Sequence, residues 1–189
     1  MSRVQPAGHL ILTTVGADLL LNILTPGEVE EGKHLWVLDS LSERESNLSV
    51  LTRDYIRSLG ERALDALRRS PVAERSRLCP ELGRIYALYG DERLVASPED
   101  KHLLVATDAH TSRTAAQVIQ RFLAEQSHAA ELLLIPQSGP SGLARELESS
   151  YADKLAAYVR QGGEVVLNLV GGPEWLREFC SSVVSRCQI

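Results

Sequence analysis

The chain has 189 residues, of which 44% are hydrophobic, so it is long and apolar enough to fold as a single domain with its own core. Its 20 Lys and Arg residues against 25 Asp and Glu residues give a net charge of −5, which argues against a broad basic surface that binds duplex nucleic acid. The 3 cysteines form no CxxC pair, and the sequence has neither a membrane-length apolar run nor a signal-peptide pattern, so we expect a cytoplasmic protein without a metal site or membrane contact.

The first part of the chain is predicted to contain one strand followed by helices. An unbroken run of apolar and β-branched residues at 10–15 is typical of a parallel strand buried on both faces, and Gly16 ends it. Leucines at helical spacing follow later, and Pro71 with the charged stretch after it ends that helix. The predicted elements are a strand at 10–15, a short helix at 18–24, a surface loop at 25–34, a long helix at 47–70, and a helix at 80–89 that Pro80 opens and Gly90 closes.

In the second part of the chain, strands and helices alternate. We predict strands at 103–106, 131–135 and 165–170, helices at 111–125, at 143–160 and from Pro173 onward, and a loop at 136–142. The first two of these strands form one βαβ unit with a right-handed crossover. The alternation predicts an α/β fold: a Rossmann-like, mostly parallel sheet with helices on both faces, forming a single domain over 1–189 with a largely helical insertion at 25–90 after the first strand.

Three of the apolar runs end in small or polar residues directly before a predicted helix. The turns follow the strands at 10–15, 103–106 and 165–170. In an open parallel sheet, the carboxyl ends of the strands and the amino ends of the following helices form the crevice in which ligands bind. We therefore expect the three turns to form one site.

The first turn combines the hydroxyls of Thr13 and Thr14 with Gly16, Ala17 and the carboxylate of Asp18. Unpaired N–H groups at a helix start can hold a phosphate or a ribose oxygen. Asp18 would repel phosphate but could accept a hydrogen bond from a ribose hydroxyl or an adenine amino group. The alternative is that Asp18 is a plain helix N-cap.

Polar groups also crowd the second turn, directly behind an apolar strand. They are Thr107, Asp108, His110, Thr111, Ser112 and Arg113. Hydroxyls and a guanidinium at a helix start suit phosphodiester oxygens. The alternative is that Asp108 or Thr111 only caps the helix and that Arg113 lies on its solvated face.

The third turn contains an amide and two glycines. Asn168 lies within a predicted buried strand and needs partners there, so it either reads a base or holds the neighbouring turn. Gly171 and Gly172 allow close backbone approach to a ligand, or serve simply to connect the strand to the helix.

The usual nucleotide and hydrolase signatures are missing from the sequence. No GxGxxG follows the first strand, and neither a P-loop nor a GxSxG is present. An ordinary NAD site, a P-loop NTPase and an α/β-hydrolase are therefore not supported.

The three turns in this order resemble the CARF family, the CRISPR-associated Rossmann-fold domains that sense cyclic oligoadenylates. The stretches that carry the resemblance are TTVGADLL (13–20), LLVATDAHTSRTAA (103–116) and LNLVGGPEW (167–175), together with CPELGRIYAL (79–88), which is similar to a short helical segment of the family. The resemblance implies a cyclic oligoadenylate as ligand, the tetra-adenylate before the hexa-adenylate, held across a homodimer. It also implies a role in type III CRISPR signalling, with a fused or separate effector as partner and no other cofactor.

The chain departs from the family at two positions linked to ring cleavage in its standalone members. The family often has Ser and Lys where this chain has Asp18 and Glu174. Two hypotheses stay open: a sensor that only binds the ring, or a metal-independent ring nuclease in which Asp18, Glu174 or His110 assists as a base. A third, an unrelated nucleotide-binding domain, predicts no preference for cyclic over linear adenylates. The residues expected at the ligand are Thr13, Thr14, Gly16, Ala17, Asp18, Thr107, Asp108, Thr111, Ser112, Arg113, Asn168, Gly171 and Gly172.

Overall fold

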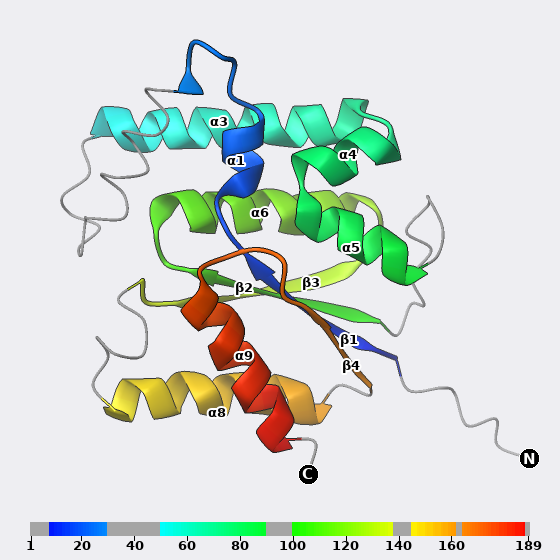
Figure 1. Cartoon of the computed structure of the whole chain (residues 1–189), viewed down its shortest axis with the longest axis vertical. Coiled ribbons are helices and arrows are strands. Elements are labelled where there is room, and N and C mark those ends of the chain that lie inside the picture. The colour runs from blue at the N-terminus through cyan, green and yellow to red at the C-terminus, as the bar shows by residue number, and fades with distance from the viewer. Residues whose placement is uncertain (1–7, 30–49, 90–99, 138–144, 162–163, 188–189) are drawn as a thin grey trace, which may run out of the picture.

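A parallel β-sheet between two layers of helices forms the framework of the protein (Figure 1). The computed structural model describes residues 8–29, 50–89, 100–137, 145–161 and 164–187. Within them the strands are β1 (Leu10–Val15), β2 (Lys101–Thr107), β3 (Ala129–Ile135) and β4 (Val165–Asn168). The strands are all parallel and lie in the order β3-β2-β1-β4. The predicted α/β class with a Rossmann-like parallel sheet is confirmed.

The burial of each strand follows its place in the sheet. β1 lies between β2 and β4, and all 6 of its residues are buried, which explains its unbroken apolar run. The edge strand β3 alternates between exposed and covered positions along its first half. The sheet therefore buries most apolar area at its centre, where β1 and β2 pair from Leu10 with Lys101 to Val15 with Ala106.

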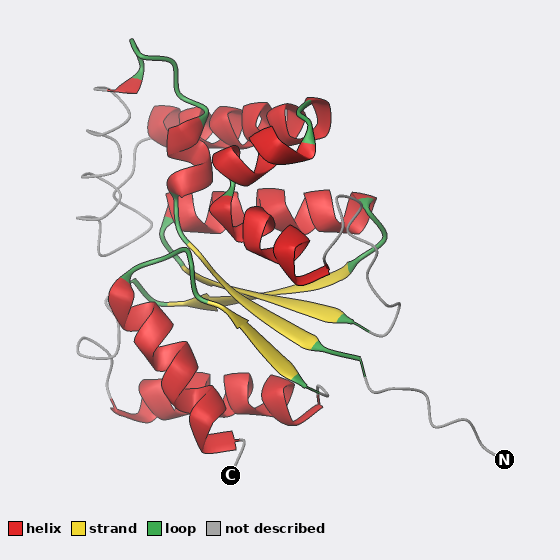
Figure 2. Ribbon diagram, turned by 45° about the vertical axis from the view of Figure 1, so that its right-hand side comes forward, coloured by secondary structure: helices red, strands yellow, loops and turns green. Residues whose placement is uncertain are grey.

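Helices cover both faces of the sheet (Figure 2). On one face lie α1 (Asp18–Asn22), α3 (Val50–Arg69), α4 (Val72–Leu78), α5 (Pro80–Tyr89) and α6 (His110–Glu125). On the other lie α8 (Arg145–Gln161) and α9 (Glu174–Cys187). Each face has its own apolar cluster, one containing Ile11 and Val15 from β1 and the other containing Leu10 and Leu12. None of the helices in the described ranges is both long and apolar enough to cross a membrane.

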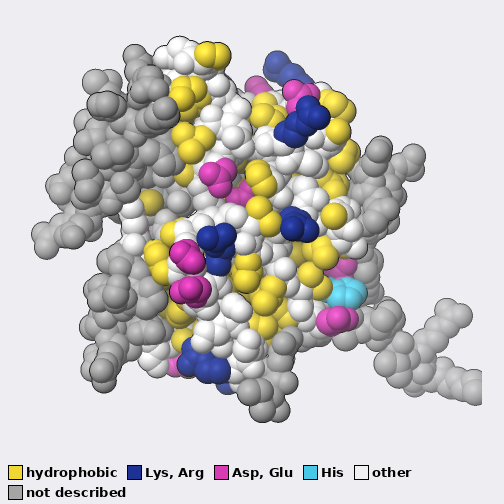
Figure 3. Space-filling model, in the orientation of Figure 1, with side chains coloured by type: hydrophobic (Ala, Val, Ile, Leu, Met, Phe, Trp, Pro, Cys, Tyr) yellow, Lys and Arg dark blue, Asp and Glu magenta, His cyan; other side chains and the backbone are white. Residues whose placement is uncertain are grey.

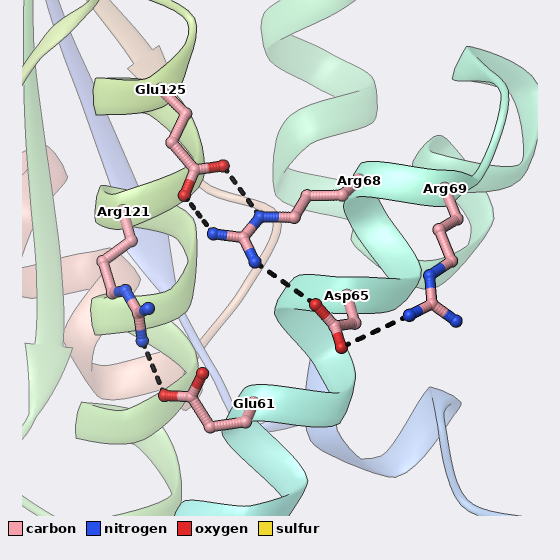
Figure 4. Close-up of polar contacts among 6 residues, drawn as sticks. All are labelled: Glu61, Asp65, Arg68, Arg69, Arg121 and Glu125. Carbon is pink, nitrogen blue, oxygen red and sulfur yellow. Dashed lines mark hydrogen bonds and ion pairs between the residues drawn. The ribbon is translucent and has the colours of Figure 1, made fainter.

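Helix α3 packs on the outer side of α6 and so forms a further layer above the sheet. The two helices approach closely at Gly60, where an added Cβ would lie 2.7 Å from Cγ2 of Thr114. Ion pairs join their exposed edges, with Arg68 bridging to Glu125 and Arg121 to Glu61 (Figure 4). The described part of the predicted insertion thus includes α3, which forms a helical layer on α6, and α5, which packs against β1 and β4.

Within the described ranges, the prediction missed one helix and misplaced several ends. Pro71 ends α3 as predicted, but it also stands at the N-cap of α4, which the prediction left out. None of the α4 residues is fully buried, and its sequence accordingly lacks the apolar stripe by which a helix is predicted. The helix predicted at 18–24 ends at Asn22, and the strand predicted at 165–170 ends at Asn168, where the chain turns toward α9. Residues 47–49, Gly90 and 138–144 lie outside the described residues.

The strand order places a topological switch point between β1 and β4. The connection from β1 to β2 runs through helices on one face, whereas α8 carries the chain from β3 over the other face to β4. The chain therefore leaves the carboxyl ends of β1 and β4 toward opposite faces of the sheet. In open α/β sheets the crevice at such a point is where ligands bind.

Candidate functional site

The first and third turns touch each other at the switch point. A Cβ added to Gly16 would lie 2.7 Å from the backbone nitrogen of Gly172. One added to Gly171 would lie 2.7 Å from the carbonyl oxygen of Thr14. Gly172 also has a φ of +78°, which favours glycine. The glycines of both turns are thus required for the two backbones to meet.

A carboxylate from α5 enters this junction from the side. Glu81 is only 1% exposed, and its Oε1 accepts a hydrogen bond of 3.4 Å from the backbone N–H of Gly16. The thiol of Cys79 donates to Oε2 at 3.4 Å. Burial raises the pKa of the Glu81 carboxyl, while the hydrogen bonds from Gly16 and Cys79 act against the rise. The nearby charge of Asp18 raises it further.

Sequence reasoning did not identify Glu81 as a site residue. The segment 79–88 is similar to a short helical segment of the family, and a single glutamate in such a helix is usually exposed to solvent. A usable signal was its helical phase, because Glu81 shares the buried face of α5 with Ile85. A charged residue in such a stripe is seldom buried without partners.

Asn168 holds the junction together from the end of β4. Its Nδ2 donates to the carbonyl oxygen of Glu81 at 2.9 Å and to Oγ1 of Thr13 at 3.3 Å. Of the two roles considered for this amide, holding the neighbouring turn is the one its donor side serves. Its Oδ1 and the Oγ1 of Thr14 are buried and have no hydrogen-bond partner among the described residues.

The second turn lies at the same edge of the sheet, but its best-defined contacts run toward β3. The backbone N–H of Asp108 donates to the carbonyl oxygen of Ile135 at 2.9 Å. Oδ1 of Asp108 accepts from the backbone N–H of Gln137 at 2.8 Å. Asp108 therefore fixes the ends of β2 and β3 relative to each other and does not cap α6.

Helix capping, the alternative considered for several site residues, is not their role here. Ala17 occupies the N-cap of α1 and Ala109 that of α6, and neither helix has a side-chain cap hydrogen bond. Asp18 and Thr111 instead lie inside the first turns of α1 and α6.

The candidate residues divide sharply by exposure. Buried side chains or glycines are Thr13, Thr14, Gly16, Thr107, Thr111, Ser112, Asn168 and Gly171. Half-buried positions are Ala17, Asp108, His110, Arg113 and Gly172. The two candidate carboxylates, Asp18 and Glu174, are exposed, each as the first residue of a helix at this edge. Solvent therefore reaches the carboxylates directly, whereas most of the hydroxyls are buried.

His110 and Arg113 line a cleft whose lining does not include Gly16, Gly171 or Gly172. This cleft of about 590 Å³ lies between α3 and α6 and also contains Arg53 and Arg57. The candidate base His110 therefore has the cleft residues of α3 and α6 around it, and not the glycines of the junction.

The described residues offer little for a metal ion, and charges on the visible surface are mixed. Among these residues no group of three or more His, Cys, Asp or Glu side chains is placed to hold one. On the face drawn in Figure 3, Lys and Arg side chains alternate with Asp and Glu.

The chain matches no protein-family model, and the comparison with curated proteins finds no significant match.

Proposed function

We propose that this chain binds a cyclic oligoadenylate, in the first place cyclic tetra-adenylate, as a cytoplasmic component of type III CRISPR antiviral signalling. The observation that carries the proposal is the contact between Gly16 and Gly172 at the switch point between β1 and β4. The two motifs that most resemble the CARF family meet at this contact, at the edge of the sheet where open α/β folds bind ligands.

The chemistry of the junction supports an uncharged, hydrogen-bonding part of the ligand at its centre. Asp18 and Glu174 are acceptors for ribose hydroxyls and adenine amino groups. Because phosphates would be repelled by these carboxylates, we expect the phosphates of the ring to lie toward the second turn.

A homodimer suits this ligand for reasons of symmetry. A cyclic tetra-adenylate has rotational symmetry, and an isologous dimer presents the same residues twice around one axis. Each subunit would then contribute its glycine junction to half of the ring. The buried hydroxyls of Thr13 and Thr107 would support the turns rather than touch the ring.

Ring cleavage is a second candidate function, favoured by the two exposed carboxylates at the site edge. In this reaction a ribose 2′-oxygen attacks the adjacent phosphorus, the bond to the 5′-oxygen breaks, a base takes the 2′-hydroxyl proton, and water protonates the departing 5′-oxygen. The products are a linear oligoadenylate with a 2′,3′-cyclic phosphate and a 5′-hydroxyl. Asp18 or Glu174 is the candidate base.

The experiment is a binding titration with cyclic tetra-adenylate in the presence of EDTA, followed by chromatography of the nucleotide. Binding with intact ring supports the sensor, and linear product supports the nuclease. Asp18→Asn and Glu174→Gln should each weaken binding or abolish cleavage, whereas Asp153→Asn, at an exposed position of α8, should do neither. Equal affinity for cyclic and linear tetra-adenylate would instead indicate an unrelated nucleotide-binding domain.

A further inference from the structure

A groove of about 620 Å³ lies along the outer side of α9, beside the loop that follows β4. It is lined by Leu169 of that loop and by Glu174, Arg177, Glu178, Ser181 and Ser182 of α9. The helix residues recur every three or four positions, on the side opposite the residues that α9 buries in the core. The stripe from 174 to 182 is about 12 Å long, and the groove volume falls within the range of small-molecule sites. The groove is therefore large enough for a nucleoside.

The charged side chains of this groove are available to a ligand. Within the described ranges, Glu174, Arg177 and Glu178 take part in no side-chain hydrogen bond and no ion pair. The guanidinium residue is half-buried, and both glutamates are exposed. Two carboxylates against one guanidinium leave the lining net negative, so a phosphate is disfavoured there. A neutral group that offers both hydrogen-bond donors and acceptors suits this lining.

The groove continues directly from the glycine junction. Gly171 follows Leu169 by two residues, and Glu174 follows Gly172 by two residues. Each of these two groove residues therefore lies within about 8 Å of a junction glycine, from Cα to Cα. In a cyclic oligoadenylate the bases project outward from the sugars and phosphates. A ring bound at the junction can thus place one base over α9.

We propose that this groove binds an adenine base of the ring and that Arg177 and Glu178 select it, an inference that rests on the proposed function. Adenine carries an amino donor at C6, with the acceptor nitrogens N1 and N7 on either side of it. The carboxylate of Glu178 accepts from the amino group, and the guanidinium of Arg177 donates to a ring nitrogen or stacks on the base. Leu169 supplies apolar surface beneath the base.

The first test compares cyclic tetra-adenylate with cyclic tetra-inosinate by calorimetric titration of the full chain. Inosine has an oxygen acceptor in place of the amino group, so the Glu178 carboxylate would face it without a proton between them. We expect the wild-type chain to bind the adenylate ring at least about fivefold more tightly than the inosinate ring. Glu178→Gln should reduce this preference to within about twofold, since an amide can donate to the inosine oxygen.

Arg177→Gln should weaken binding of the adenylate ring by about fivefold, because a charge-assisted contact is lost. The matched controls are Arg160→Gln and Asp153→Asn, which change exposed charges on α8 outside the groove. Both controls should leave the affinity for each ring unchanged.

The free nucleosides separate this inference from the ring-binding proposal. In an NMR titration to about 10 mM, adenosine should shift the backbone amides of Ser181 and Ser182, and inosine should shift them less. If adenosine does so while the ring binds no more tightly than adenosine, the groove assignment stands and the ring-binding proposal fails. Three outcomes would overturn the groove assignment: amides that neither adenosine nor the ring shifts, an equal response to the adenine and inosine forms, or a preference for adenine that Glu178→Gln leaves unchanged.

Discussion

The carboxylate of Glu81 accepts a hydrogen bond from the backbone N–H of Gly16, 65 residues earlier in the chain, at a donor–acceptor distance of 3.4 Å. This contact ties α5 to the turn after β1, and Asn168 completes it by donating to the Glu81 carbonyl oxygen. The proposed ring-binding edge is therefore held in shape by a buried acidic group that the ligand need not touch.

Glu81→Gln should change how stability depends on pH. Burial raises the folded-state pKa of Glu81 above its ordinary value of 4.5, so the wild-type chain loses stability as the pH rises above that value. The amide has no such proton to lose. We expect the difference in unfolding free energy, variant minus wild type, to increase from pH 5 to pH 7.5, at no more than about 1.4 kcal/mol per pH unit. Urea unfolding at both pH values measures it, and a constant difference would refute the buried-carboxyl account.

Gly171→Ala should destabilise the fold by about 2–4 kcal/mol. Its Cβ would collide with the Glu81 carboxylate and would lie 2.7 Å from the carbonyl oxygen of Thr14 and 2.9 Å from the Gly16 nitrogen. Gly27→Ala is the matched control, because nothing lies within 4 Å of the added carbon there. Thermal and urea unfolding of both variants would test this, and similar stabilities would mean that the two turns are not in contact.

His102 should remain neutral to an unusually low pH. It is buried on β2, with its Nε2 3.2 Å from Nδ1 of His128 and 3.2 Å from the hydroxyl of Tyr89. Burial, and then the neighbouring His128, lowers its pKa from 6.5 to about 4. As the pH falls, His102 takes up a proton at a higher pH in the unfolded chain than in the folded chain. The free energy of unfolding is therefore at its full value above pH 6.5 and decreases toward pH 4.

NMR titration of the imidazole resonances gives the measurement for His102. We expect its midpoint to lie near pH 4, with loss of up to about 3 kcal/mol of stability between pH 6.5 and that midpoint. A midpoint between about 6 and 7, the range of exposed histidines, would show that the ring is solvated.

Gly60→Ala should have opposite effects in two backgrounds. In the wild-type chain its Cβ would lie 2.7 Å from Cγ2 of Thr114, and overpacking of this kind costs about 1–3 kcal/mol. In a Thr114→Ser background that methyl group is absent, and alanine should stabilise α3 by about 0.5–1 kcal/mol through its helix propensity. Unfolding of the four chains as a double-mutant cycle tests the contact. Equal effects in both backgrounds would place α3 and α6 further apart than described.

The sequence predicted the elements that carry strong local signals. Strand 10–15 and helix 80–89 agree with β1 and α5 at both ends, because a buried apolar run and a proline at a helix start are local properties. Helix α4 was missed because it buries no residue fully, so no apolar periodicity marks it in the sequence. The strand order was not predicted, since no local pattern says over which face a connection passes.

The candidate site was predictable only in part, for a similar reason. Glycines in turns at strand ends are visible in sequence, and Gly16, Gly171 and Gly172 do meet. Glu81 reaches the site from a distant helix, so its role depends on tertiary packing. His110 and Arg113 were expected at the sheet edge, but the position of α3, which the sequence did not indicate, makes them part of the cleft.

The central claim is that the junction of the β1 and β4 turns recognises a cyclic oligoadenylate across a dimer. The most direct measurement is sedimentation and calorimetric titration of the wild-type chain with cyclic tetra-adenylate, beside linear tetra-adenylate. We predict saturation at one ring per two chains and an affinity for the ring at least about tenfold above that for the linear form. A monomer in the presence of the ring, or equal affinity for both nucleotides, would contradict the account.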